Sequence, residues 1–146
     1  MIRHVWTVAA TEAEIEEETK NIGLRVLEQL NLTAWPEPEA GQTVMLPVPW
    51  KLVSMWTRDS TGVEVGHARH RLLSPHGAQL AEVHLRLEIE DPLRRLRVFT
   101  ESPSLVVTCS GVYEITTEQE AEPGAWREVA RVPLEIQIEW RESAGR

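Results

Sequence analysis

Apolar and polar side chains alternate along much of this chain of 146 residues. The last segment shows it most clearly, because every apolar residue there is followed by a polar one: Leu134, Glu135, Ile136, Gln137, Ile138, Glu139, Trp140, Arg141. Successive side chains of a strand point to opposite faces, so the pattern predicts a strand with one buried and one solvated face. Residues 83–90 repeat the pattern and predict a second such strand.

Turn residues divide the middle of the chain into three segments, at 51–58, 63–73 and 79–90. The dividers are Asp59-Ser60-Thr61-Gly62 and Ser74-Pro75-His76-Gly77. Proline presets the backbone angle of a turn, and glycine tolerates positive φ. This order predicts a three-stranded antiparallel meander over residues 51–90, which Asp91-Pro92 ends.

Further strands are predicted at 4–10, 96–100, 105–109, 112–118 and 126–140, with loops at 35–41 and 119–124. Pro133 lies inside the last of these strands. Proline has no N–H to give to a ladder, so it marks an edge or a bulge there.

Residues 11–32 allow two interpretations. Thr11 and Glu14 have the spacing of a capping box, which favours a short helix over residues 12–20. Ile15 is the only large apolar residue of that segment, and the rival interpretation is a hairpin that turns around residues 17–21. Residues 23–32 fit either period.

About eight short strands punctuated by turns predict a mostly β protein, an antiparallel two-sheet β-sandwich formed by a single domain over residues 1–146. A short N-terminal helix is the one addition that the capping box allows. Tyr113, two residues after Gly111, has the spacing of a tyrosine corner, in which the hydroxyl binds the preceding backbone. This spacing favours an immunoglobulin-like sandwich, with Tyr113 as a structural residue.

The charge and the cysteine content limit the classes of partner and the cellular compartment that we expect. The net charge of −8 repels a polyanion, so we expect no binding to nucleic acid. No uncharged stretch reaches the roughly twenty residues of a membrane-spanning helix, so we expect no membrane association. Cys109 is the single cysteine, which fits a reducing compartment and predicts a cytoplasmic protein.

Arg94, Arg95 and Arg97 form the densest basic segment, and five glutamates between residues 12 and 18 form an acidic one. One interpretation is that both are solvated surfaces. The other is that the arginines contact an anionic group or a partner, and that the two opposite charges support head-to-tail self-association.

Tryptophan is the most unusual feature, with six residues against one phenylalanine and one tyrosine. Trp6, Trp56 and Trp140 lie on predicted strands and are expected in the core. Trp35 and Trp126 lie in or beside loops, where an exposed indole offers a flat surface to a ligand or a partner. The alternative is that tryptophan only supplies core volume where phenylalanine is absent.

The histidines and the cysteine do not form a pattern typical of catalysis. His67 and His70 are placed on opposite faces of a strand, and a zinc site needs three or four convergent ligands. His70 shares a face with Ala68 and Leu72, which predicts a hydrogen-bonded core histidine. We therefore expect no metal, no cofactor and no catalytic residue, and a structural Cys109.

Several weakly specific segments together resemble a family of small uncharacterised bacterial β-sandwich proteins, a domain of unknown function. The resembling segments are residues 4–8, 18–24, 26–30, 53–58, 74–77, 111–113 and 132–136. The resemblance implies an immunoglobulin-like or fibronectin-III-like fold and brings no catalytic residue, cofactor or partner.

Three functions remain open. The first is a non-enzymatic binding or assembly module that acts through loops or a sheet edge on a protein partner or on a second copy of itself, as a homo-oligomer. The alternative is a binder of a small ligand or carbohydrate that uses Trp35 or Trp126. The third is an enzyme with a Glu/His or Cys/His site.

Overall fold

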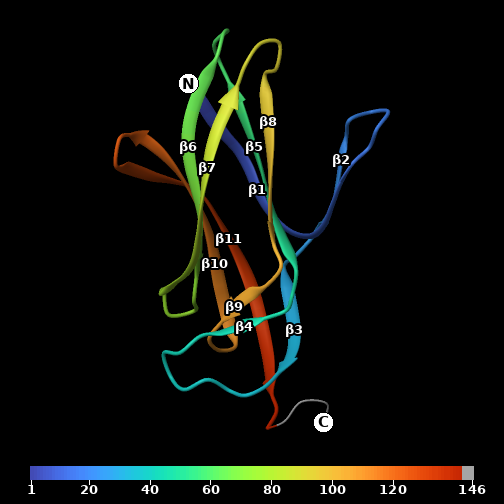
Figure 1. Cartoon of the computed structure of the whole chain (residues 1–146), viewed down its shortest axis with the longest axis vertical. Coiled ribbons are helices and arrows are strands. Elements are labelled where there is room, and N and C mark those ends of the chain that lie inside the picture. Colours follow the sequence, from blue (N-terminus) through green and yellow to red (C-terminus); the bar gives the residue numbers. More distant parts are fainter. Residues whose placement is uncertain (143–146) are drawn as a thin grey trace.

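Within residues 1–142, β-strands are the only regular secondary structure (Figure 1). The computed structural model describes residues 1–142 and contains no helix within them. The strands are β1 (Ile2–Ile15), β2 (Ile22–Val26), β3 (Gln29–Ala34), β4 (Val44–Leu46), β5 (Trp50–Arg58), β6 (Glu64–Leu73), β7 (Gln79–Ile89), β8 (Arg95–Ser102), β9 (Leu105–Val107), β10 (Gly111–Glu122) and β11 (Ala125–Trp140). The prediction of a mostly β protein is confirmed.

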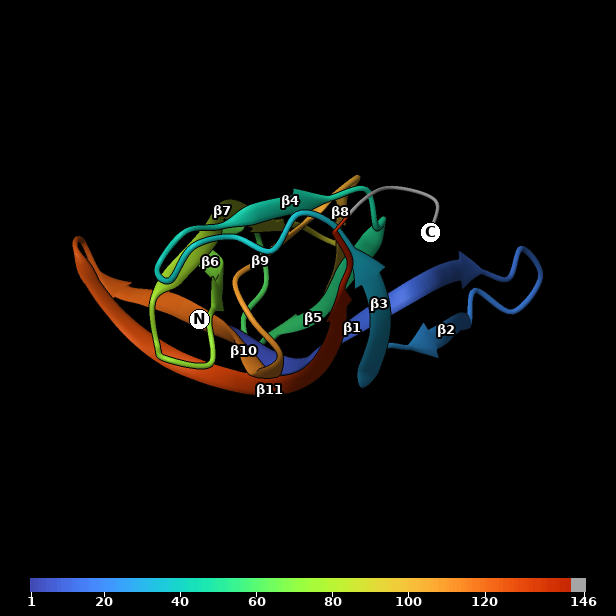
Figure 2. The same ribbon diagram turned by 90° about the horizontal axis from the view of Figure 1, so that it is seen from below.

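Two larger sheets and one small sheet arrange these strands. Sheet A has the order β2-β1-β5-β8, and sheet B has the order β3-β11-β10-β6-β7. Sheets A and B face each other (Figure 2), and the pair β4-β9 lies toward one end of the molecule (Figure 1). All pairs are antiparallel except β3 with β11, which is parallel.

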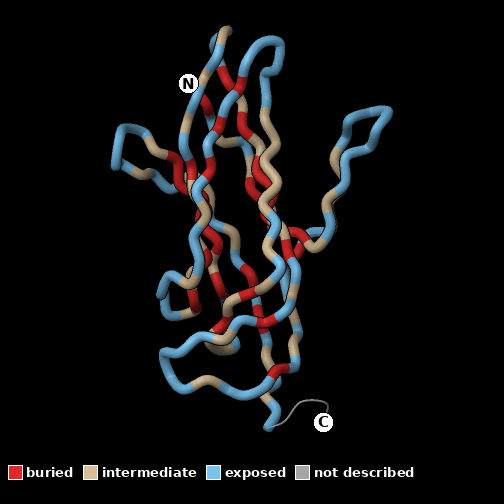
Figure 3. The backbone as a smooth tube through the Cα atoms, viewed as in Figure 1, coloured by how far each residue is buried: buried red, intermediate tan, exposed pale blue. Residues whose placement is uncertain are grey.

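The apolar core lies between the two larger sheets. One buried cluster joins Leu52 of sheet A to Ile115 and Leu134 of sheet B, and a second joins Trp56 to Leu87. Figure 3 shows the buried residues along these sheets, whereas the β1–β2 hairpin and the loop before β4 are mostly exposed. The alternation predicted in β7 and β11 is confirmed, since Leu85, Leu87 and Ile89 are buried, as are Leu134 and Ile136.

The predicted N-terminal helix is wrong, and residues 11–26 form the rival hairpin. β1 continues to Ile15 and pairs with β2, so that Ile15 lies opposite Ile22. The Glu16 N–H donates to the Asn21 carbonyl at 2.8 Å, and Lys20 takes a positive φ of 60° in the turn. A helix would have had only Ile15 to bury, whereas the hairpin sets Ile15 beside Ile22 and Ala13 beside Leu24.

The predicted meander over residues 51–90 is also wrong. β6 and β7 pair as expected, but β5 belongs to sheet A, where β1 and β8 flank it. The turn at residues 59–62 therefore carries the chain from one sheet to the other. The predicted loop at 119–124 shrinks, because Glu122 already pairs with Ala125 across the turn. Gln119 keeps this stretch of β10 extended by donating from Nε2 to the Ile2 carbonyl at 2.6 Å.

The buried guanidinium of Arg58 fixes the end of the molecule where β5 passes to β6. Its Nε donates to the Leu93 carbonyl at 2.8 Å, its Nη1 donates to the carbonyls of Gly62 and Ile89, and its Nη2 donates to Asp91 at 2.5 Å. The other oxygen of Asp91 accepts the Gly62 N–H at 2.9 Å. One side chain thus ties the 59–62 turn to the segment that follows β7.

Tyr113 forms the predicted tyrosine corner. Its hydroxyl accepts the N–H groups of Thr108 and Cys109, at 2.9 and 3.1 Å, and donates to the Cys109 carbonyl at 2.5 Å. The ring is fully buried. Gly111 has a φ of 150°, and a Cβ there would lie 2.9 Å from Pro75 Cγ, so only glycine fits beside the corner.

We expect Tyr113→Phe to lower the free energy of unfolding by about 1–3 kcal/mol, because it removes the hydroxyl and leaves buried backbone groups without a partner. Chemical denaturation followed by circular dichroism measures the change. A loss below about 0.5 kcal/mol, the range of an unremarkable surface substitution, would show that water replaces the hydroxyl at no cost.

Candidate functional site

Trp35 lies on an apolar groove at the end of the molecule that carries β4. The indole is 49% exposed, and Met45 across the groove is 69% exposed. The groove encloses about 330 Å³. It is lined by Leu32, Thr33, Ala34, Trp35, Val44, Met45, Leu46, Pro47 and Val48. The expectation that Trp35 is exposed is confirmed.

None of the residues that line this groove is charged. Residues 29–36 and 40–49 contain no Asp, Glu, Lys or Arg, although such residues make up 26% of the chain. We call the exposed surface of these two segments the uncharged end. It includes the side chains of Gln29, Asn31, Thr33, Trp35, Met45 and Pro47.

The uncharged end contains an open sheet edge. β3 pairs with β11 on one side, and it is the outer strand of sheet B on the other (Figure 1). Native proteins usually protect such an edge with lysine, proline or a bulge, because its free N–H and C=O groups accept another strand. Gln29–Ala34 has no charged residue, no proline and no shift of register against β11.

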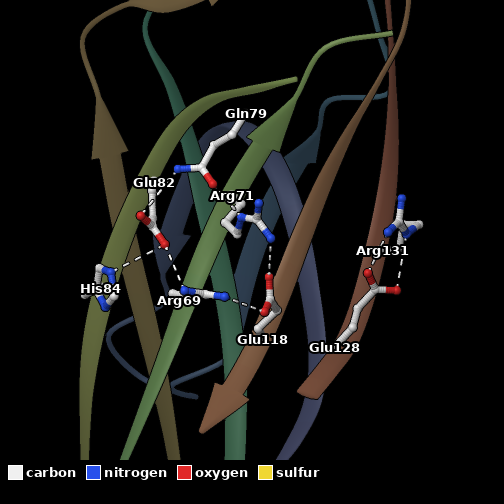
Figure 4. A network of polar contacts seen from close by, with 8 residues as sticks. All are labelled: Arg69, Arg71, Gln79, Glu82, His84, Glu118, Glu128 and Arg131. Carbon is white, nitrogen blue, oxygen red and sulfur yellow. Dashed lines mark hydrogen bonds and ion pairs between the residues drawn. The ribbon is translucent and has the colours of Figure 1, made fainter. Parts of the chain in front are cut away.

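Trp126 is partly buried on the outer face of sheet B. The Arg69 guanidinium lies 4.4 Å from its ring centroid, and His84 makes an edge contact at 5.7 Å. Arg69 also bridges Glu82 and Glu118, at 3.3 and 2.8 Å (Figure 4). The indole therefore packs within a charged network of its own chain.

Glu118 is the central acid of that network. Burial alone would raise its pKa, but the hydrogen bonds and charges of Arg69 and Arg71 outweigh burial, so the pKa of Glu118 is lowered. Arg71 donates to Glu118 at 2.9 Å and to Gln79 at 2.7 Å (Figure 4). The positive charges of Arg69 and Arg71 are balanced by the negative charges of Glu82 and Glu118.

The structure places Arg94, Arg95 and Arg97 before and along β8. Arg94 and Arg95 are exposed, and Arg97 is partly buried. Arg97 donates from Nη2 to the Lys20 carbonyl at 3.0 Å, in the turn of the β1–β2 hairpin. The basic strand thus contacts the backbone of the acidic turn of its own chain.

The three tryptophans expected in the core differ in depth. Trp56 is fully buried and donates from Nε1 to Ser54 Oγ at 2.9 Å. Trp6 and Trp140 are only partly buried. Trp50 is more deeply buried than either, and its Nε1 donates to the Ser104 carbonyl at 2.9 Å.

His70 is buried and hydrogen-bonded, as the sequence predicts. Its Nδ1 lies 2.9 Å from Thr117 Oγ1, and burial lowers its pKa to about 4. His67, His76 and His84 are exposed, and Cys109 is half-buried beside the tyrosine corner. Within residues 1–142, no three His, Cys, Asp or Glu residues form a group that could hold a metal ion.

Sequence reasoning missed the polar groups between the sheets, Thr7, Thr117 and His4. Thr7 and Thr117 are buried and share a hydrogen bond of 2.9 Å from one sheet to the other. The signal that could have found them is a hydroxyl at an inward position of an alternating strand.

The described part of the chain has no helix that is long and apolar enough to cross a membrane. Comparisons with protein-family models, with curated proteins and with solved structures found no match.

Proposed function

We propose that this protein is a non-enzymatic assembly module that joins a second copy of itself through the uncharged end. The observation that carries the proposal is the unprotected edge of β3 beside an exposed apolar groove. Two β3 edges pair by backbone hydrogen bonds, and the Trp35 and Met45 side chains of each copy pack against the other.

Charge favours a second copy as the occupant. A chain with a net charge of −8 repels its own kind over most of its surface. The uncharged end adds no charge of its own, so two copies that approach through it meet less of that repulsion. A closed two-fold contact between equal surfaces is also the commonest oligomer geometry.

The lining of the groove supports an apolar protein surface over a carbohydrate. Sugar recognition combines an indole face with polar side chains that bind hydroxyl groups. Among the lining residues, only the Thr33 hydroxyl and the indole N–H of Trp35 are polar side-chain groups. A carbohydrate on Trp35 is therefore the weaker alternative.

The finer fold class belongs to the same proposal. Two facing sheets and the Tyr113 corner support an immunoglobulin-like sandwich of the kind found in the small bacterial proteins that the sequence resembles. A cytoplasmic location is supported by the single cysteine.

The test is the mass in solution as a function of concentration. We expect sedimentation equilibrium to show a dimer of twice the 16.6 kDa chain mass at high concentration. We expect Trp35→Glu and Met45→Glu each to weaken the dimer at least about tenfold, because a charge at the centre of an apolar contact is desolvated without a partner.

Val63→Glu is the matched control. Val63 is 60% exposed in the loop between β5 and β6, at the opposite end of the molecule from β4 (Figure 1). It adds the same charge, so it reports the effect of general repulsion. A monomer at all concentrations, or an equal effect of all three substitutions, would refute the proposal.

A further inference from the structure

A second groove lies at the base of the β1–β2 hairpin, and we call it the hairpin groove. It encloses about 390 Å³ between residues 7–9 of β1, residues 26–28, Val112 of β10 and residues 132–135 of β11. Two of its apolar lining residues, Val26 and Val112, are 55% and 52% exposed. Contiguous apolar side chains that stay this open to water mark a contact surface.

The hairpin groove adjoins the first residue of β3. Gln29 lies opposite Glu135, which lines the groove, and the Glu135 N–H donates to the Glu28 carbonyl at 3.0 Å. The groove at the uncharged end adjoins the last residue of the same strand, since Ala34 and Trp35 line it. The two grooves therefore lie at the two ends of β3, on the side of the molecule from which the hairpin extends (Figure 1).

An antiparallel contact between two β3 edges brings these opposite ends together. Its two-fold axis is perpendicular to the sheet, so directly opposite side chains share a face and the contact is centred on a residue. The two middle residues of β3 are Asn31 and Leu32. Centred on Asn31, the contact sets Trp35 of one copy opposite Leu27 of the other, and centred on Leu32 it sets Trp35 opposite Gln29. Either register places the indole beside the hairpin groove of the other copy.

The hairpin groove suits an indole in size and in chemistry. Its volume is more than twice the roughly 150 Å³ that accommodates benzene. Within residues 1–142 the indole N–H groups of Trp50 and Trp56 donate hydrogen bonds, whereas that of Trp35 has no acceptor. Glu28 and Glu135 line the groove beside its apolar residues, and a carboxylate accepts such an N–H.

We propose that the Trp35 indole of each copy inserts into the hairpin groove of the other copy. This contact rests on the proposed assembly through β3 and adds the site that receives each indole. It is reciprocal, as a two-fold contact requires, because each copy supplies one indole and one groove. It also covers Val26, Val112 and Trp35, three exposed apolar side chains that the single chain leaves open to water.

Val112→Glu tests the hairpin groove without changing β3 or Trp35. It puts a charge where the indole would be buried, so we expect sedimentation equilibrium to show a dimer at least about tenfold weaker than that of the wild type. Val65→Glu is the matched control, because Val65 is 49% exposed on β6 of the same sheet and does not line the groove.

The outcomes separate this contact from the assembly itself. A wild-type dimer that Val112→Glu and Val65→Glu weaken equally would overturn the insertion of Trp35 and leave assembly through β3 in place. A wild type that stays monomeric at all concentrations would refute both.

A double-mutant cycle tests whether Trp35 and Val112 meet between copies. Within one chain they are apart, because Val112 lies opposite Glu135 and Ala34 lies opposite Trp140, about 17 Å further along β11. The factor by which Trp35→Ala with Val112→Ala raises the dimer Kd should be at least about threefold smaller than the product of the two single factors. A factor equal to that product would overturn the proposal.

Discussion

Arg58→Met should lower the free energy of unfolding by about 3 kcal/mol or more, the largest effect that we expect from a polar substitution. Methionine keeps most of the aliphatic volume and removes the guanidinium. The carbonyls of Gly62, Ile89 and Leu93 then lose a charged donor, and the Arg58 side chain that served them is only 2% exposed. Breaking such a buried set costs more than an exposed ion pair. Urea denaturation of the variant measures the loss.

Asp91→Asn is the control for this variant. Asp91 is exposed, and the amide oxygen of asparagine still accepts the Gly62 N–H, so the loss should be clearly smaller. If the two losses were equal, the ion pair rather than the carbonyl contacts would hold this end together.

Asp91 also gives this end a pH dependence. The hydrogen bond from the Gly62 backbone, followed by that from Arg58, lowers the pKa of Asp91 below its usual 3.8. A carboxyl group with a lowered folded pKa stabilises the protein above its unfolded pKa, and that contribution is lost as the pH falls through the folded value. Below about pH 4 the difference between wild type and Asp91→Asn should therefore shrink.

Trp56→Ala should lower the free energy of unfolding by about 3–5 kcal/mol, as large-to-small substitutions of buried aromatic residues do. Trp56 is fully buried, and its ring meets His4 edge-on at a centroid distance of 5.0 Å. Alanine leaves a cavity beside Leu87 and Ile89 and removes the donor to Ser54. Denaturation should be followed by circular dichroism, because the substitution removes a tryptophan and so changes the fluorescence signal.

Trp35→Ala makes the same chemical change at an exposed site. In the dilute monomer it should change the free energy of unfolding by less than about 0.5 kcal/mol. If both variants lost a similar free energy of unfolding, Trp56 would not be a core residue and Trp35 a surface residue, as the structure describes them.

The alternation of apolar and polar residues predicted the strands, because a strand with one face on the core needs an apolar side chain at every second position. β7 and β11 were predicted closely, since each has one face on the core. Pro133 lies where β11 has β10 as its only neighbour, because β3 begins to pair at Glu135. Its missing N–H therefore costs no ladder bond.

Assignment of strands to sheets was not predictable in the same way. The segments on both sides of residues 59–62 alternate, and alternation does not say whether the next strand pairs or crosses to the facing sheet. In the fold, Arg58 stabilises this crossing by binding the carbonyls of Leu93 and Ile89, which are distant in sequence. The capping box at Thr11 gave the wrong prediction for a related reason. A helix in a protein is stabilised mainly by packing an apolar face, and the segment after Thr11 has almost no apolar side chains to pack, so the local motif is not enough.

Only part of the candidate sites was predictable. Exposure of Trp35 followed from its neighbouring prolines, and burial of His70 followed from its place beside Ala68 and Leu72. The uncharged end depends on two segments that meet only in the fold, the end of β3 and β4. The hydrogen bonds that link His4, Thr7, Thr117 and His70 join three strands that lie far apart in the sequence.

Hydrogen exchange at two protein concentrations tests the assembly through β3 most directly. We predict that the β3 amides that point away from β11 exchange fast in dilute solution and become protected at high concentration, while the amides of the loop around Val63 exchange equally at both. Equal exchange of the β3 amides at both concentrations would contradict the account, since the edge would then stay open to water.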